Sequence, residues 1–148
     1  VHADERAAFA DSRLQDHAFE YFFRWTELRE WAFRLRDAGT RSVSILGFGK
    51  NIYAFTQALR AADLEITGIS DHRLAAPDRT YRGLPLRSVS ASSLNNGDAI
   101  LIGDMASVHA AATHRRHLEM ISRPVHVWTL TDRDYAMVEH PVGRFASI

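Results

Sequence analysis

Short apolar runs alternate with helix-like segments from Gly39 to the end of the chain. The runs over residues 41–46, 64–69, 99–102 and 125–130 have the length and apolar content of buried strands, and residues 84–89 form a further short strand in a loop-rich segment over 72–98. Residues from Asn51 to about Ala62, and residues 107–122, read as helices. This order is typical of βαβ units and predicts an α/β fold with a mostly parallel sheet flanked by helices.

The segment before Gly39 has a different pattern. Residues 4–37 contain no Gly or Pro and predict one long helix or two, ended by Gly39. We therefore divide the chain into an N-terminal helical segment over 1–38 and a Rossmann-like domain over 39–148.

Aromatic side chains point in several directions around this N-terminal segment. They are more numerous than one amphipathic stripe requires: Phe19, Tyr21, Phe22, Phe23, Trp25, Trp31 and Phe33. We expect the surplus to be covered by a second copy in a homodimer or by a neighbouring domain. The alternative is a segment bent into two helices that both pack on the core.

Small and acidic residues follow four of the predicted strands. They are Gly47-Phe48-Gly49, Ser70-Asp71, Gly103-Asp104 and Thr131-Asp132. Because the carboxyl ends of parallel strands meet at one edge of a sheet, where ligands of such folds bind, we expect a ligand site there.

The glycine turn Gly47-Phe48-Gly49 lies between a strand and a helix, which lets the main chain approach a pyrophosphate at the helix N-terminus. Asp71 follows the next strand at about the spacing, roughly 20 residues, of a ribose-binding carboxylate. The third glycine of G-x-G-x-x-G is replaced by Ile52, so we expect looser packing of helix on strand. The predicted ligand-binding residues are Gly47, Phe48, Gly49, Lys50, Asn51, Asp71, Gly103 and Asp104. In the alternative reading, the glycines only form a tight turn and Asp71 caps a loop.

Lys50 is the single lysine of the chain, and it lies in this turn. It is either a phosphate contact or a solvated turn residue. A Walker A loop is excluded, because Ser44 and Asn51 stand where that motif needs Gly and Ser or Thr. A methyltransferase-like cofactor site is compatible with this scaffold, but the acidic residue often expected at the end of the first strand is absent.

The histidines predict no metal site. His114 and His117 have i,i+3 spacing on one helix but no carboxylate to complete a ligand set, so we interpret them as solvent-exposed. His72, next to Asp71, is either an acid-base group or a loop residue. We assign no catalytic residue, and whether the chain is an enzyme stays open.

Composition sets further bounds. The chain has 148 residues, is 46% hydrophobic and 24% charged, and fits one compact domain. Its formal net charge is zero, so no overall field favours nucleic acid or an anionic membrane as a partner. The absence of cysteine excludes disulfides and thiolate sites. We find no membrane span or signal peptide and expect a cytoplasmic protein; a start at Val1 fits a piece of a longer one.

The stretches ILGFGKNIYAFTQAL, ITGISD, YRGLPL and DAILIGD carry a resemblance over residues 41–132. They resemble the Rossmann-like domains that accompany sugar-modifying transferases and polysaccharide-biosynthesis proteins. The resemblance implies that Gly47, Gly49 and Asp71 face a nucleotide or nucleotide-sugar, in a sugar-transfer or surface-polysaccharide pathway. The alternatives are an NAD-dependent oxidoreductase, which lacks a substrate domain here, and a non-catalytic interaction domain with a degenerate nucleotide site. The candidate cofactors are a nucleotide, a nucleotide-sugar or NAD(P).

Overall fold

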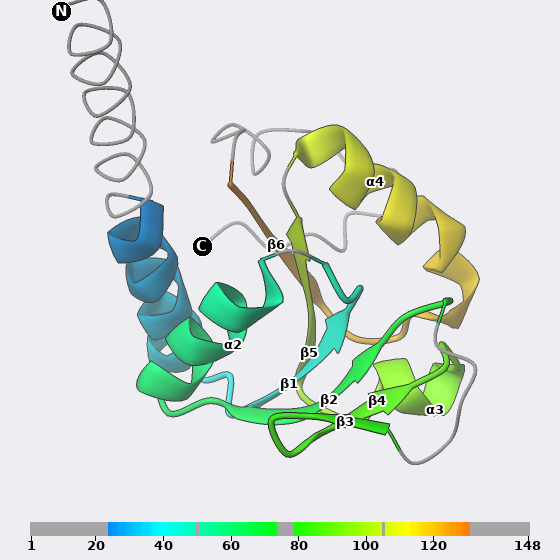
Figure 1. Ribbon diagram of the computed structural model, residues 1–148, viewed down its shortest axis with the longest axis horizontal. Coiled ribbons are helices and arrows are strands. Elements are labelled where there is room, and N and C mark those ends of the chain that lie inside the picture. The colour runs from blue at the N-terminus through cyan, green and yellow to red at the C-terminus, as the bar shows by residue number, and fades with distance from the viewer. Residues whose placement is uncertain (1–23, 50, 74–78, 105, 131–148) are drawn as a thin grey trace, which may run out of the picture.

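The computed structural model describes residues 24–49, 51–73, 79–104 and 106–130, and shows a six-stranded sheet with helices on both faces (Figure 1). Residues 24–37 are helical. The elements that follow are β1 (Ser42–Leu46), α2 (Ile52–Ala61), β2 (Glu65–Ser70), β3 (Arg79–Tyr81), β4 (Leu84–Arg87), α3 (Ala91–Leu94), β5 (Ala99–Asp104), α4 (Ser107–Arg116), the 3₁₀ turn η1 (Leu118–Met120) and β6 (Val125–Thr129).

The strand order β3-β4-β2-β1-β5-β6 places β1 in the interior of the sheet. All neighbouring strands pair in parallel except β3, which pairs antiparallel with β4 at the edge. From β1 the chain passes to the neighbouring strand β2 and then to the edge hairpin of β3 and β4. It next crosses to β5, on the other side of β1. The order of the five parallel strands is that of a Rossmann-like sheet, and its direction reverses between β1 and β5. The predicted fold class is confirmed.

Alternate residues of β5 face two separate cores. Ala99 and Leu101 pack with α2 and the 24–37 helix, whereas Ile100 and Ile102 pack with α3 and α4. Figure 1 shows the two helical layers on opposite sides of the sheet. Burial on both faces explains why β5 is continuously apolar in the sequence instead of alternating.

The 24–37 helix is part of the first core. Leu28, Trp31, Ala32 and Leu35 are buried against α2 and the sheet. Arg24 is buried too: its Nε donates to the Leu130 carbonyl at 2.7 Å, and its guanidinium lies 5.0 Å from the Trp128 ring centre. The helix ends before Gly39, which has φ +105°, as predicted. Phe19, Tyr21, Phe22 and Phe23 lie outside the described residues.

Four element predictions need correction. β3 was missed; it forms a hairpin with β4 through Arg82 and Gly83, both at positive φ. α3 was also missed, although Ser90 and Ser93 form a reciprocal capping box. β5 continues through Gly103 and Asp104. The helix predicted over 107–122 ends at Arg116, and η1 follows it.

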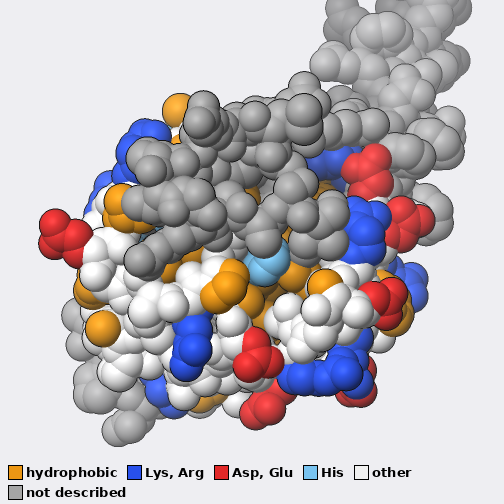
Figure 2. Space-filling view, turned by 180° about the vertical axis from the view of Figure 1, so that it is seen from behind, with side chains coloured by type: hydrophobic (Ala, Val, Ile, Leu, Met, Phe, Trp, Pro, Cys, Tyr) orange, Lys and Arg blue, Asp and Glu red, His pale blue; other side chains and the backbone are white. Residues whose placement is uncertain are grey.

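The surface carries charges of both signs. On the face in Figure 2, basic and acidic side chains of the described residues are interspersed. No helix within the described ranges is long and apolar enough to cross a membrane.

Candidate functional site

A pocket of about 420 Å³ lies at the carboxyl ends of β1, β2 and β5, beside α4. This is the place where the strand order reverses, and its volume falls within the range of small-molecule sites. Its lining consists of Leu46, Gly47, Phe48, Gly49, Asp71, His72, Arg73, Gly103, Asp104, His109, Thr113 and His117.

The glycine turn forms one wall of this pocket. Gly47 has φ +102°, and its amide donates to the Ser70 carbonyl at 2.7 Å, which joins the turn to the end of β2. Apart from the two chain neighbours of Gly49, no atom of the described residues lies within 4 Å of a Cβ built on it, so the main chain there borders open space. Asn51 caps α2 without a side-chain hydrogen bond to the helix, and no acidic residue lies in the first turn. The positive end of the helix dipole is therefore not neutralised by α2 itself.

Asp71 fastens the glycine turn to the segment after β2. It is only 3% exposed, and its Oδ2 accepts a 2.7 Å hydrogen bond from the Phe48 amide. Arg73 donates to the same carboxylate from its main-chain amide at 2.8 Å, from Nε at 3.0 Å and from Nη2 at 2.8 Å. These four hydrogen bonds use the acceptor capacity of a carboxylate.

The protonation state of Asp71 follows from these contacts. Burial raises the pKa of Asp71, but hydrogen bonds from the Arg73 side chain and from the Phe48 and Arg73 amides outweigh it. The net pKa lies well below its usual range. Asp71 is therefore ionised at neutral pH, and its charge is balanced by Arg73.

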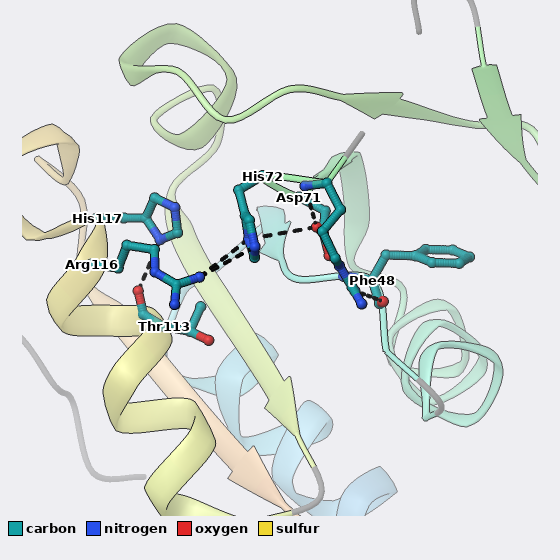
Figure 3. A network of polar contacts seen from close by, with 7 residues as sticks. Phe48, Asp71, His72, Thr113, Arg116 and His117 are labelled. Carbon is teal, nitrogen blue, oxygen red and sulfur yellow. Dashed lines mark hydrogen bonds and ion pairs between the residues drawn. The ribbon is translucent and has the colours of Figure 1, made fainter. Parts of the chain in front are cut away.

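The side chain of Phe48 points away from His72, Arg116 and His117 on the other side of the pocket (Figure 3). Its ring packs edge-on against Tyr81 of β3, with centroids 5.3 Å apart. Only the main chain of the turn is then presented on the pocket side, as a close approach to a ligand requires.

The sequence predicted looser packing of α2 on its strand at Ile52, but the structure shows a close contact between α2 and β5. Phe55, one turn further along α2, lies against Gly103 of β5, and a Cβ on Gly103 would be 2.9 Å from the Phe55 ring. Ile52 itself is buried at 8% exposure. The close contact of helix and sheet is therefore made at Gly103 of β5, and not at the third glycine position of the dinucleotide fingerprint, which Ile52 occupies here.

One face of α4 forms the opposite wall. His109, Thr113 and His117 recur every four residues and line the pocket together. Nδ1 of His117 lies 2.9 Å from the Thr113 carbonyl. Since a carbonyl only accepts, Nδ1 carries the proton. These residues were missed as site residues, although their spacing on a helix that follows a strand end was a usable signal.

The interpretation of His114 and His117 as solvent-exposed is wrong. They are 1% and 4% exposed. His114 lies with Ala110 among the buried residues of α4, and His117, the C-cap residue, lines the pocket. Within the described residues, no group of three or more His, Asp or Glu side chains is arranged to hold a metal ion.

Six of the eight predicted ligand-binding residues line this same pocket: Gly47, Phe48, Gly49, Asp71, Gly103 and Asp104. Asn51 is buried beside the turn and is not among the lining residues; its Nδ2 has no hydrogen-bond partner in the described part of the chain. Lys50 and the predicted strand end Thr131-Asp132 lie outside the described residues. That these residues bind a ligand stays a prediction.

Comparison with protein-family models and with the sequences of curated proteins finds no match for this chain.

Proposed function

We propose that this chain binds a nucleotide or a nucleotide-linked metabolite in the pocket between the glycine turn and α4. A phosphate of the ligand contacts the Gly49 main chain and the N-terminus of α2, while the amides of Gly47 and Phe48, which donate to the Ser70 carbonyl and to Asp71, hold the turn in place. The proposal covers a nucleotide, a nucleotide-sugar and NAD(P), and the pathway that fits the sequence resemblance is sugar transfer or surface-polysaccharide synthesis.

The observation that carries this proposal is the position of the pocket. It lies between β1 and β5, where the strand order reverses, and the glycine turn forms its wall. In open α/β sheets the ligand crevice is found at this point. A helix start without a side-chain cap, next to glycine main chain, can supply amide donors to a phosphate.

Asp71 has a different role in this proposal from the one that its spacing predicted. Its oxygens are engaged by Arg73 and Phe48, so a ribose hydroxyl would have to displace the Arg73 side chain. We propose that Asp71 positions the turn, and that Arg73, whose side chain is 64% exposed, is the group that meets the ligand.

A thermal-shift screen tests the proposal, because a ligand that binds only the native state raises its apparent stability. The panel contains nucleoside mono- and diphosphates, nucleotide-sugars, NAD and NADP. We expect at least one of them to raise the Tm of the wild-type chain, and Gly49→Leu to abolish this rise. The added side chain at Gly49 enters open space, so the fold is retained.

Ala61→Leu is the matched control. It adds a leucine to an exposed position at the other end of α2, away from the turn. This variant should keep the ligand-induced Tm rise. The proposal fails if no member of the panel stabilises the wild type, or if Gly49→Leu responds like Ala61→Leu.

We also propose that the N-terminal helical segment contributes to self-association. Phe33 on the 24–37 helix is 44% exposed while its neighbours Trp31 and Leu35 are buried in the core. Light scattering over a concentration series should show a dimer that Phe33→Glu dissociates and Val108→Glu, at an exposed site on α4, does not. A monomer at all concentrations contradicts this.

A further inference from the structure

Three basic side chains gather at the α4 side of the pocket: His72 and His117 line it, and Arg116, which is not among the lining residues, lies against His72 at its rim. His72 follows β2, and Arg116 and His117 lie at the end of α4; Figure 3 shows His72 between Asp71 and these two residues. The ring centroids of His72 and His117 are 6.4 Å apart. We call His72, Arg116 and His117 the basic wall.

Within the described ranges, no carboxylate is paired with the Arg116 guanidinium of the basic wall. Nη1 of Arg116 lies 3.3 Å from Nε2 and 3.5 Å from Nδ1 of His72. Among the described residues Arg116 makes no ion pair, and the nearest acid to His72, Asp71 at 3.8 Å, is already paired with Arg73. Basic groups placed together without an acid between them favour a bound anion.

His117 can donate a hydrogen bond to such an anion from Nε2 when its ring is protonated. Because its Nδ1 proton is used by the Thr113 carbonyl, Nε2 donates only when the ring takes up a second proton. The binding of an anion at Nε2 is therefore coupled to proton uptake. The titratable and charged groups on the surrounding elements are Asp71, His72 and Arg73 after β2, Asp104 on β5, His109, His114, Arg115 and Arg116 on α4, Glu119 on η1 and His126 on β6.

We infer that the basic wall is a second phosphate subsite, distinct from the glycine turn, so that the pocket takes a ligand with two phosphate groups. A phosphate fits better than a carboxylate, because its tetrahedral oxygens can accept from donors on two elements at once. This inference deepens the proposed function and rests on it for the identity of the ligand.

Inorganic phosphate is the probe, and calorimetry of the full chain is the measurement. Arg116→Gln should weaken phosphate binding by about tenfold, the usual effect of losing a charge-assisted hydrogen bond. Arg115→Gln is the matched control: it removes the same charge from the adjacent exposed position, and it should change the affinity by less than about twofold. Both substitutions are on the surface of α4, so neither should disturb the fold.

Proton uptake gives a second, independent signature. Above the second pKa of phosphate, titrations in buffers with different ionisation heats should show net proton uptake by the wild type. His117→Gln should lower this uptake, because His72 is then the only imidazole left in the basic wall, and Gly49→Leu should leave the uptake intact.

The outcomes separate this inference from the proposed function. If Arg116→Gln and Arg115→Gln bind phosphate equally well, or the wild type binds none, the basic wall is not a phosphate subsite. If phosphate binding depends on Arg116 but no nucleotide of the panel stabilises the chain, the subsite stands and the proposed function fails.

Discussion

The main-chain amide of Phe48 donates a 2.7 Å hydrogen bond to the buried carboxylate of Asp71. This contact joins the loop after β1 to the loop after β2, at the edge of the sheet where the pocket lies. The same carboxylate holds Arg73, whose Nη2 also donates to the Phe48 carbonyl at 2.6 Å. The shape of the glycine turn therefore depends on an acid 23 positions further along the chain.

Asp71→Asn should lower the free energy of unfolding by about 1–3 kcal/mol. One of the two main-chain amides that donate to Asp71, those of Phe48 and Arg73, loses its acceptor, and the ion pair with Arg73 is lost. Urea denaturation of both proteins measures the difference. Asp63→Asn, on an exposed aspartate after α2, is the control and should be nearly neutral. An equal stability of wild type and Asp71→Asn would show that the carboxylate does not hold the turn.

The stability contributed by Asp71 should disappear in acid. Its pKa is depressed in the folded state, so its contribution is fully present above the unfolded-state pKa near 3.9 and is lost as the pH falls below that value. The difference in unfolding free energy between wild type and Asp71→Asn should thus be constant from about pH 5 to 7 and shrink below about pH 4. A difference that grows towards low pH would give the opposite sign and contradict the assignment.

Much of the fold follows from the sequence because strands such as β5 and β6 are buried on both faces. Ala99–Ile102 and Val125–Thr129 read as apolar runs, and the residues after each strand carry the turn chemistry that identifies the ligand edge. β3 could not be recognised in this way. Its residues Arg79–Tyr81 form an exposed edge strand with no apolar alternation, and its pairing is fixed by the Arg82-Gly83 turn.

The candidate site was predicted on one wall only. Main-chain features such as the glycine turn are local in sequence, so they are visible in it. The α4 wall depends on which face of a helix turns towards the pocket, and α4 has few apolar residues to indicate that face. The role of Asp71 needed the structure for another reason: its partner Arg73 is close in sequence, but the Phe48 amide is brought to it only by the pairing of β1 with β2.

Gly103→Ala should destabilise the fold by about 1–3 kcal/mol, because the new methyl group would lie 2.9 Å from the Phe55 ring. In a Phe55→Leu background the same substitution should cost less, since the ring atoms that it meets are gone. A double-mutant cycle by urea denaturation measures this coupling. Additive effects of the two substitutions would mean that the contact does not limit the packing of α2 on β5.

The two glycines of the turn should respond differently to alanine. Gly47→Ala forces an L residue to adopt φ +102° and should cost about 1–3 kcal/mol of stability. Gly49 is not at positive φ and has open space around it, so Gly49→Ala should change stability by less than about 0.5 kcal/mol. Thermal unfolding of the pair without ligand distinguishes them, and a larger loss for Gly49→Ala would contradict the geometry of the turn.

The central claim, that the pocket at the reversal of strand order binds a nucleotide-type ligand, is tested most directly by ¹H–¹⁵N NMR titration of the wild-type chain with the nucleotide panel. We predict that the largest shift changes fall on the amides of Gly47, Phe48 and Gly49, with smaller changes at Gly103 and along the His109–His117 face of α4. Shift changes confined to residues outside this pocket, or no change with any nucleotide, would contradict the claim.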